Sequence, residues 1–407
     1  MSCLEMKRRP AWLAWVWGLL LFWLSYGGAL AQPRAAIPGF SEPAAGMPQP
    51  PEIAARGFVL LDLSTQQVLA LRQSDQVIPP ASLAKLMTAY LTCQAVKSGD
   101  LAWGDRLPMS ELAWQTAVGS GARSLASPGT QFTVAEWMQG LAVLGAHDAA
   151  VVLAEGVAGS VQDFVPRMNR QAQTLGLAST EFRNPEGATV AGQVSTPRDL
   201  AWLAARLLND CPSILTYYRQ PNVTLAGVQQ GSTNLLALRD PTVDGLHVAY
   251  ADRLGYAMAA TSRRPVAGVE RRLVAVLFGM ASEQARAIET QKLLNWGHSA
   301  FDVVRLFAAG QAVSVAPVWK GSARMVSIGR SQPIIVAVPR GQAARIQTTL
   351  TRQDPLLAPL AQGQTVGQLR ITLGGQPWQT LPLQALEPVP SAGWLGRTWD
   401  AIRLGIQ

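Results

Sequence analysis

The sequence predicts an α+β domain followed by a small all-β domain. Strand-like segments lie within residues 57–71 and again after residue 243, and the stretch between them has helical patterning. Strands at both ends of a domain with helices between them predict one sheet that the later strands complete. The 407 residues are 48% hydrophobic and 15% charged, which is enough apolar material for two folded domains.

The N-terminus has the pattern of a secretory signal peptide. Basic residues 7–9 precede an apolar stretch over residues 11–26, and small residues 29–31 follow it. We expect residues 1–31 to be removed, although the apolar stretch is also near the length of an uncleaved membrane anchor. Residues 32–52 are rich in Pro, Ala and Gly and are expected to form a linker.

The charge balance is basic without being concentrated. The formal net charge is +8, and no Lys/Arg run with interleaved aromatic residues occurs. A dispersed positive charge is typical of a protein that binds an anionic membrane or wall polymer, and equally of an ordinary solvated surface. The charge pattern does not indicate binding to nucleic acid.

The first domain, residues 53–308, opens with a hairpin. Residues 57–63 and 68–71 are apolar and flank a Ser-Thr-Gln-Gln turn. After Pro79-Pro80 a helix is expected over residues 81–97, because apolar residues recur there at i, i+3, i+4, i+7 and i+8.

Further elements follow from the same patterns. The stretch 134–156 is nearly free of charge, as a helix buried on most sides would be. The other expected helices cover residues 161–175, 197–208 and 283–306, and the expected strands cover residues 243–249, 255–261 and 272–279.

The chain beyond residue 310 changes character. Short Val/Ile-rich segments separated by Gly and Pro predict a small all-β domain over residues 311–390. In residues 391–407 Trp394, Trp399 and further apolar residues form one helical stripe beside arginines. This pattern predicts an amphipathic helix in a lipid interface, although a terminal helix that packs on its own protein has the same pattern.

Cysteine usage is sparse. Cys3 leaves with the leader, so Cys93 and Cys211 remain. An oxidising compartment would permit a disulfide, but Cys93 lies among apolar residues of an expected helix, and we expect two buried free thiols. No metal-ligand spacing of Cys or His occurs in the sequence.

Ser82 and Lys85 form the strongest chemical motif. At the start of the expected helix their spacing of three residues places the hydroxyl and the amine on one face. A lysine whose pKa is lowered by burial can take the proton of a serine hydroxyl, and the helix N-terminus adds a favourable field. An isolated Ser-x-x-Lys is far more often a plain helix cap.

The chain resembles serine D-alanyl-D-alanine carboxypeptidases, the low-molecular-mass penicillin-binding proteins, from about Gly57 to the C-terminus. The nucleophile motif of that family matches Pro80 to Thr88. Matching segments follow in the same order: Gly176-Leu177, Asn184-Pro185, Ser195-Thr196, Asp199-Leu200-Ala201, Val243-Asp244-Gly245, Gly255-Tyr256, Arg286 with Glu289, and Leu293 to Trp296. The resemblance implies a β-lactamase/transpeptidase-like antiparallel sheet with helices, then the small β domain and a membrane-anchor helix.

Two motifs of this superfamily are altered. The Ser-x-Asn position is occupied by Gly145-Ala146-His147, and the Lys-Thr-Gly position by His247-Val248-Ala249. Two of the three histidines therefore stand at altered motif positions. We hypothesise that His147 carries protons and that His247, when protonated, binds the substrate carboxylate, so that activity depends on pH where imidazole titrates. The alternative is that the site has decayed and the histidines fill space. The third, His298, is expected to be structural.

The resemblance implies a serine carboxypeptidase that removes the terminal D-Ala of peptidoglycan stem peptides. Ser82 would attack and Lys85 would accept its proton. The amides of Ser82 and Tyr250 would form an oxyanion hole, and Arg286 would recognise the carboxylate. The implied partners are stem peptides, β-lactam antibiotics and the inner-membrane surface. No metal or organic cofactor is implied. The implied location is the periplasm, at the outer face of the inner membrane.

Two other functions remain open. A non-catalytic relative would bind wall peptide without turnover. A β-lactamase of class A type needs a dedicated glutamate for deacylation. Glu181 and Glu186 lie in the intervening sequence, but nothing in the sequence around them places either beside Ser82.

Overall fold

The computed structural model of the protein describes residues 37–266 and 268–394. Within those ranges no helix combines the length and the apolar character needed to cross a bilayer. The described part ends at Trp394, so most of the expected C-terminal helix lies outside it. The expected leader, residues 1–31, also lies outside it.

The first domain is built on an antiparallel sheet of six strands in the order β2-β1-β10-β9-β7, with β8 also pairing with β9. The first two strands are the expected hairpin, and the later strands complete the sheet, as the sequence predicts. The bounds are β1 Gly57–Asp62, β2 Gln67–Arg72, β7 Val243–Gly245, β8 Val248–Ala251, β9 Gly255–Val266 and β10 Val269–Met280.

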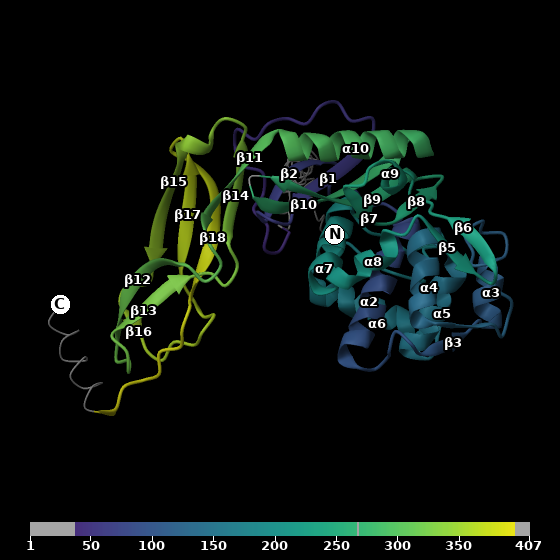
Figure 1. The fold of residues 1–407 in the computed structure, drawn as a ribbon, viewed down its shortest axis with the longest axis horizontal. Coiled ribbons are helices and arrows are strands. Elements are labelled where there is room, and N and C mark those ends of the chain that lie inside the picture. Colours follow the sequence, from purple (N-terminus) through teal and green to yellow (C-terminus); the bar gives the residue numbers. More distant parts are fainter. Residues whose placement is uncertain (1–36, 267, 395–407) are drawn as a thin grey trace, which may run out of the picture. The chain divides into compact units, whose positions relative to one another are not determined.

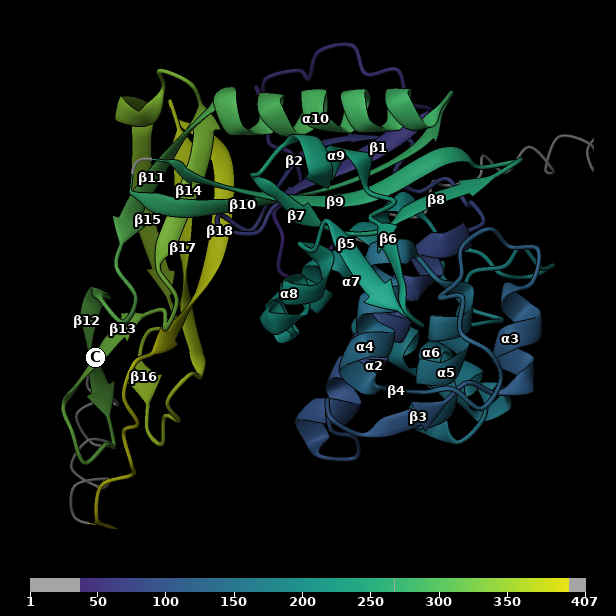
Figure 2. The same cartoon turned by 45° about the vertical axis from the view of Figure 1, so that its right-hand side comes forward.

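Both faces of this sheet are buried. Side chains of successive strand residues point to opposite faces, so Val59 and Leu61 join one apolar cluster while Phe58 and Leu60 join the other. Figures 1 and 2 show α10 (Glu283–Ser299) along one face and α2 (Lys85–Ser98) and α7 (Pro197–Asp210) on the other. Helix α2 therefore lies within the larger of these two clusters.

The helical region has one break that the sequence pattern does not show. The single helix expected over residues 134–156 is two helices, α4 (Val134–Gln139) and α5 (His147–Ala158), joined by a π-helical turn. The π turn ends at Gly145, which adopts a left-handed φ of 65°, and Ala146 is the extended N-cap of α5. The break places His147 at the first position of α5.

Two of the remaining helices agree with the sequence patterns. Helix α6 (Val161–Leu175) has the bounds expected, and α7 is two residues longer than expected. The other elements are short: β3 Arg106–Pro108, α3 Glu111–Ala117, β4 Gln131–Thr133, α8 Leu215–Tyr218, β5 Asn222–Leu225, β6 Val228–Gly231 and α9 Leu235–Arg239.

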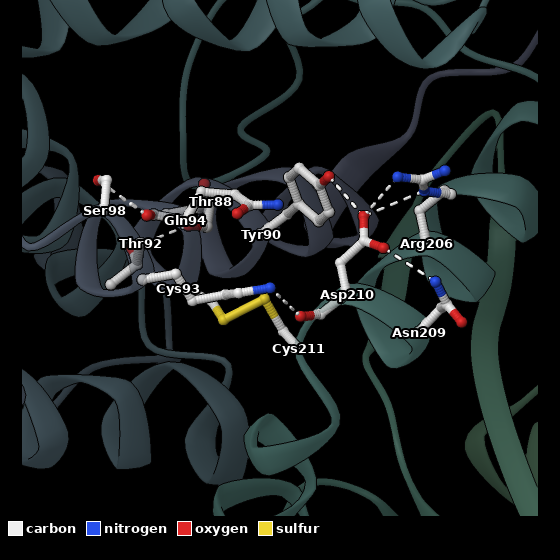
Figure 3. The surroundings of a disulfide bond; sticks show 11 residues. Thr88, Tyr90, Thr92, Cys93, Gln94, Ser98, Arg206, Asn209, Asp210 and Cys211 are labelled. Carbon is white, nitrogen blue, oxygen red and sulfur yellow. Dashed lines mark hydrogen bonds and ion pairs between the residues drawn. A yellow bond between two sulfur atoms is a disulfide. The ribbon is translucent and has the colours of Figure 1, made fainter. Parts of the chain in front are cut away.

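Cys93 and Cys211 form a disulfide, so the expectation of two free thiols is wrong. Cys93 lies on α2, and Cys211 follows directly after α7 (Figure 3). Packing of these two helices brings the Cα atoms to 6.4 Å, within the range a disulfide spans, although the residues are 118 apart in sequence. The bond ties the helix that begins at Lys85 to a second helix of the same core.

Residues 37–52, expected as part of a linker, contain no helix and pack on the first domain. Ile37 is buried in the main core, Ser41 forms an isolated bridge with Gln67, and Glu42 pairs with Arg198 at 2.6 Å. The segment therefore continues the folded domain toward the N-terminus.

The second domain is all-β, as expected, but it begins earlier. The helix expected over residues 283–306 ends at Ser299, and β11 (Phe301–Phe307) pairs with β14 (Ile334–Pro339) of the second domain. The boundary therefore lies near residue 300 rather than at residues 308–311. The other strands are β12 Ala312–Trp319, β13 Met325–Gly329, β15 Ile346–Arg352, β16 Leu356–Leu357, β17 Thr365–Leu373 and β18 Gln376–Ala385.

Candidate active site

Ser82 lies on a tight turn that leads into the buried helix α2. Residues Ala81–Ala84 form a 3-10 turn after Pro79-Pro80, and α2 begins at Lys85. Ser82 is half-buried, whereas the Lys85 side chain is fully buried. The turn thus keeps the hydroxyl accessible and places the amine beneath it.

The Lys85 Nζ atom is 3.3 Å from the Ser82 Oγ atom and donates a 2.6 Å hydrogen bond to the backbone carbonyl of Glu186. Burial lowers the pKa of Lys85 to about 7, against the opposing charges of the Glu186 and Asp148 carboxylates. At neutral pH a large fraction of Lys85 is therefore unprotonated and can accept the serine proton. The two side chains lie within hydrogen-bonding distance, as their spacing in the sequence predicts.

The segment Asn184–Gly187 packs directly against the nucleophile turn. Gly187 adopts a left-handed φ of 83°, and a Cβ atom there would lie 2.0 Å from the Ala81 carbonyl oxygen and 2.9 Å from the Ser82 Cα atom. Only glycine fits this approach. The fold therefore brings Glu186 beside Lys85, a placement that the sequence did not reveal.

His147 is half-buried at the start of α5. Burial, followed by the charge of Lys85, lowers the pKa of His147 to about 3, so its imidazole is neutral at physiological pH. The adjacent Asp148 is engaged elsewhere, because its carboxylate accepts hydrogen bonds from the backbone amide and the hydroxyl of Ser124.

His247 is buried, with 2% exposure, and contacts Tyr218. The Tyr218 hydroxyl and the His247 Nε2 atom are 2.6 Å apart, and burial, followed by the charge of Lys85, lowers the pKa of His247 to about 3. An imidazole with this pKa is neutral between pH 5 and 8, which argues against the expected protonated form of His247. Burial also raises the pKa of Tyr218, so the hydrogen bond joins a neutral phenol to a neutral imidazole.

Strand β8 borders the nucleophile turn. It pairs with β9, with Tyr250 opposite Tyr256, and contacts the 3-10 turn that carries Ser82. The Tyr250 side chain is exposed, and its hydroxyl donates to Asp252 at 3.1 Å. Arg286 reaches the same strand from α10 and donates to the Ala249 carbonyl at 3.5 Å. Tyr250 and Arg286 therefore both meet at the strand that borders Ser82.

Three contributors were missed by the sequence analysis: Glu186, Tyr218 and Ser124. Tyr218 and Ser124 lie on short or irregular segments with no periodic pattern, and each meets its partner only through the tertiary fold. The Asn-Pro-Glu-Gly sequence was a usable signal for Glu186, since a glycine there indicates a close backbone approach. No group of three or more His, Cys, Asp or Glu side chains within residues 37–266 and 268–394 is arranged to hold a metal ion.

Comparison with known proteins gives consistent matches over both domains. Residues 44–282 match the family model for D-alanyl-D-alanine carboxypeptidase, and residues 301–391 match the model for the C-terminal domain of penicillin-binding protein 5. D-alanyl-D-alanine carboxypeptidase DacC of Escherichia coli is 32% identical over 359 residues, which cover 87% of this chain and 89% of that protein.

Solved structures agree with these matches. Penicillin-binding protein 5 from Haemophilus influenzae superposes with a TM-score of 0.78 at 30% identity, covering 84% of this chain and all of that one. Penicillin-binding protein D2 from Listeria monocytogenes, solved in an ampicillin-bound form, superposes with a TM-score of 0.55 at 29% identity over 62% of this chain. The matches favour an enzyme over a non-catalytic relative. The chain therefore belongs to the D-alanyl-D-alanine carboxypeptidase family and is a serine-type hydrolase of that class.

Proposed function

We propose that the protein removes the terminal D-alanine of peptidoglycan stem peptides through an ester on Ser82. The 3.3 Å approach of Lys85 to Ser82, together with the lowered pKa of Lys85, is the observation that carries this assignment. Lys85 takes the hydroxyl proton, Ser82 Oγ bonds to the carbonyl carbon between two D-alanines, and the proton passes to the departing D-alanine amine. Water then hydrolyses the ester.

Charge that develops on the carbonyl oxygen is stabilised by the backbone amides of Ser82 and Tyr250. This use of backbone donors does not depend on the altered side chains at positions 247–249. Arg286 supplies the positive charge for the terminal carboxylate. His147 and His247 are both neutral at physiological pH, so neither supplies a charge to the substrate.

The rest of the stem peptide extends along β8. A cavity of about 620 Å³ begins at Ala251–Arg253, directly after Tyr250, and Val77–Pro79 and Thr189–Val194 complete its lining. Since Pro79 lies three residues before Ser82, this cavity adjoins the nucleophile turn and offers space for the residues that precede the two D-alanines. β-Lactams would acylate the same serine.

The protein acts in the periplasm, at the outer face of the inner membrane. The leader pattern supports export, and the Cys93–Cys211 disulfide supports an oxidising compartment independently of the leader. The amphipathic residues 391–407 would lie in the lipid interface. Fractionation of cells that express the full chain should recover it with periplasmic membranes, and removal of residues 391–407 should release it into the soluble periplasm.

The activity is tested by D-alanine release from a peptide that ends in D-Ala-D-Ala. We expect Ser82→Ala to lower this release by about a thousandfold or more. Ser98→Ala, an exposed serine on the same helix, is the matched control and should retain full activity. Equal release by wild type and Ser82→Ala would contradict the assignment.

A further inference from the structure

Glu186 is a buried acidic residue whose backbone contacts Lys85, and the acylation step does not use its carboxylate. The residue is 6% exposed, and its own backbone carbonyl accepts the Lys85 hydrogen bond. Burial raises the pKa of Glu186, while its own backbone amide and the Lys85 charge oppose that rise. Placing a carboxylate out of water is costly, so a buried one beside reacting groups indicates a function.

The loop that carries Glu186 is fixed by a dense set of hydrogen bonds. The Asn184 Oδ1 atom accepts from the Gly187 amide at 2.8 Å and from the Gln193 side chain at 3.1 Å, and the Ala188 carbonyl accepts from both Asn184 and Gln193. The Pro185 carbonyl accepts from Thr88 on α2 at 2.7 Å. These hydrogen bonds, together with the close packing of Gly187 against the turn that carries Ser82, fix the position of Glu186 before substrate binds.

The other acids and bases around Lys85 are poor candidates for activating water. The Asp148 carboxylate accepts hydrogen bonds from Ser124, and from the Ala149 amide at 2.7 Å. His247 is engaged by Tyr218, and the pKa values of His147 and His247 are lowered to about 3, which makes both weak bases. Glu186, whose backbone carbonyl contacts Lys85 and whose carboxylate interacts with the Lys85 charge, is the acidic side chain that remains.

We propose that Glu186 is the general base that hydrolyses the Ser82 acyl-enzyme. This assignment rests on the proposed function, since it requires that Ser82 be acylated. It implies that the protein destroys its β-lactam adducts instead of retaining them.

The step is balanced without any further reactant. The Glu186 carboxylate takes a proton from water as the water oxygen bonds to the acyl carbon. Collapse of the tetrahedral intermediate breaks the bond between that carbon and Ser82 Oγ, and the proton held by Glu186 returns to Oγ. The products are the free acid and the original serine hydroxyl.

The test is the lifetime of the benzylpenicilloyl adduct, followed by intact mass after excess penicillin is removed. Glu186→Gln is nearly isosteric but cannot act as a base, and its adduct should persist about a hundredfold longer or more than that of wild type. Glu181→Gln is the matched control, because Glu181 is half exposed and pairs with Arg183 at 2.6 Å. Its adduct should decay at the wild-type rate.

Each outcome has a distinct meaning. Equal adduct lifetimes in wild type and Glu186→Gln would overturn the role of Glu186 and assign deacylation to Lys85, while leaving the acylation mechanism intact. Failure of wild type to form any adduct would instead contradict the proposed function. If Glu186→Gln does not acquire the adduct, Glu186→Asp decides: a lifetime at least tenfold above wild type supports the role, and an unchanged lifetime overturns it.

Discussion

The Lys85 ammonium nitrogen lies 3.3 Å from the Ser82 hydroxyl oxygen, and the lysine side chain is completely buried. Burial of a cation without a carboxylate in contact favours the neutral amine, which is the form that can accept a proton. Proton transfer from Ser82 therefore depends on the burial of Lys85.

The rate of acylation by benzylpenicillin should rise with pH through about 7. Below that pH Lys85 is protonated and cannot accept the Ser82 proton, so the rate should fall about tenfold per pH unit. Stopped-flow or quenched intact-mass measurements between pH 5 and 9 give this profile. A rate that does not change between pH 5 and 8 would contradict the role of Lys85.

His147→Asn should keep the same midpoint in that profile. The imidazole is already neutral throughout this pH range, because burial lowers the pKa of His147 to about 3. The substitution also restores the asparagine that the related motif carries, so the rate itself should be maintained or increased. Loss of the pH dependence in His147→Asn would show that the histidine is the titrating group.

Gly187→Ala should lower both stability and the acylation rate. The new Cβ atom would overlap the Ala81 carbonyl and press on Ser82, at a cost of about 2–3 kcal/mol or more. Gly99→Ala is the control, since Gly99 has a similar φ of 84° but no atom within 4 Å of a Cβ there. Gly99→Ala should lower the free energy of unfolding by only about 1 kcal/mol, through backbone strain, and should leave the acylation rate unchanged. Denaturant unfolding and adduct formation measure the two effects, and similar effects of the two substitutions would contradict the packing described.

Replacing both Cys93 and Cys211 with serine should reduce the free energy of unfolding by about 2–5 kcal/mol. The disulfide closes a loop between residues 118 apart and so restricts the unfolded chain. Chemical denaturation of the wild type measures this free energy with and without dithiothreitol. The reduced wild type should unfold at the same denaturant concentration as the double variant. If reduction does not change the unfolding midpoint, the disulfide does not stabilise the fold.

The elements that the sequence predicted well have strong local patterns. The hairpin of β1 and β2 and helix α6 each show a clear period and clear breaks, and Ser160 caps α6 by accepting from Asp163. The break before His147 could not be seen, because apolar Ala, Leu and Val residues continue on both sides of Gly145. Similarly, β11 follows α10 with no Gly or Pro, and its strand state depends on pairing with β14.

The site was predicted where it depends on local spacing and missed where it depends on the tertiary fold. Ser82 and Lys85 are one helical turn apart, so the sequence alone places them together. Glu186 is 101 residues from Lys85, and Cys93 is 118 residues from Cys211. The charge state of His247 depends on its burial against Tyr218, which no local pattern reveals.

The activation of Ser82 by Lys85 is tested most directly by intact-mass measurement after brief exposure to benzylpenicillin. Wild type should gain one penicilloyl group at Ser82, Ser82→Ala should gain none, and Lys85→Ala should acquire it far more slowly. An adduct that forms equally well on Ser82→Ala, or at the wild-type rate on Lys85→Ala, would contradict the mechanism.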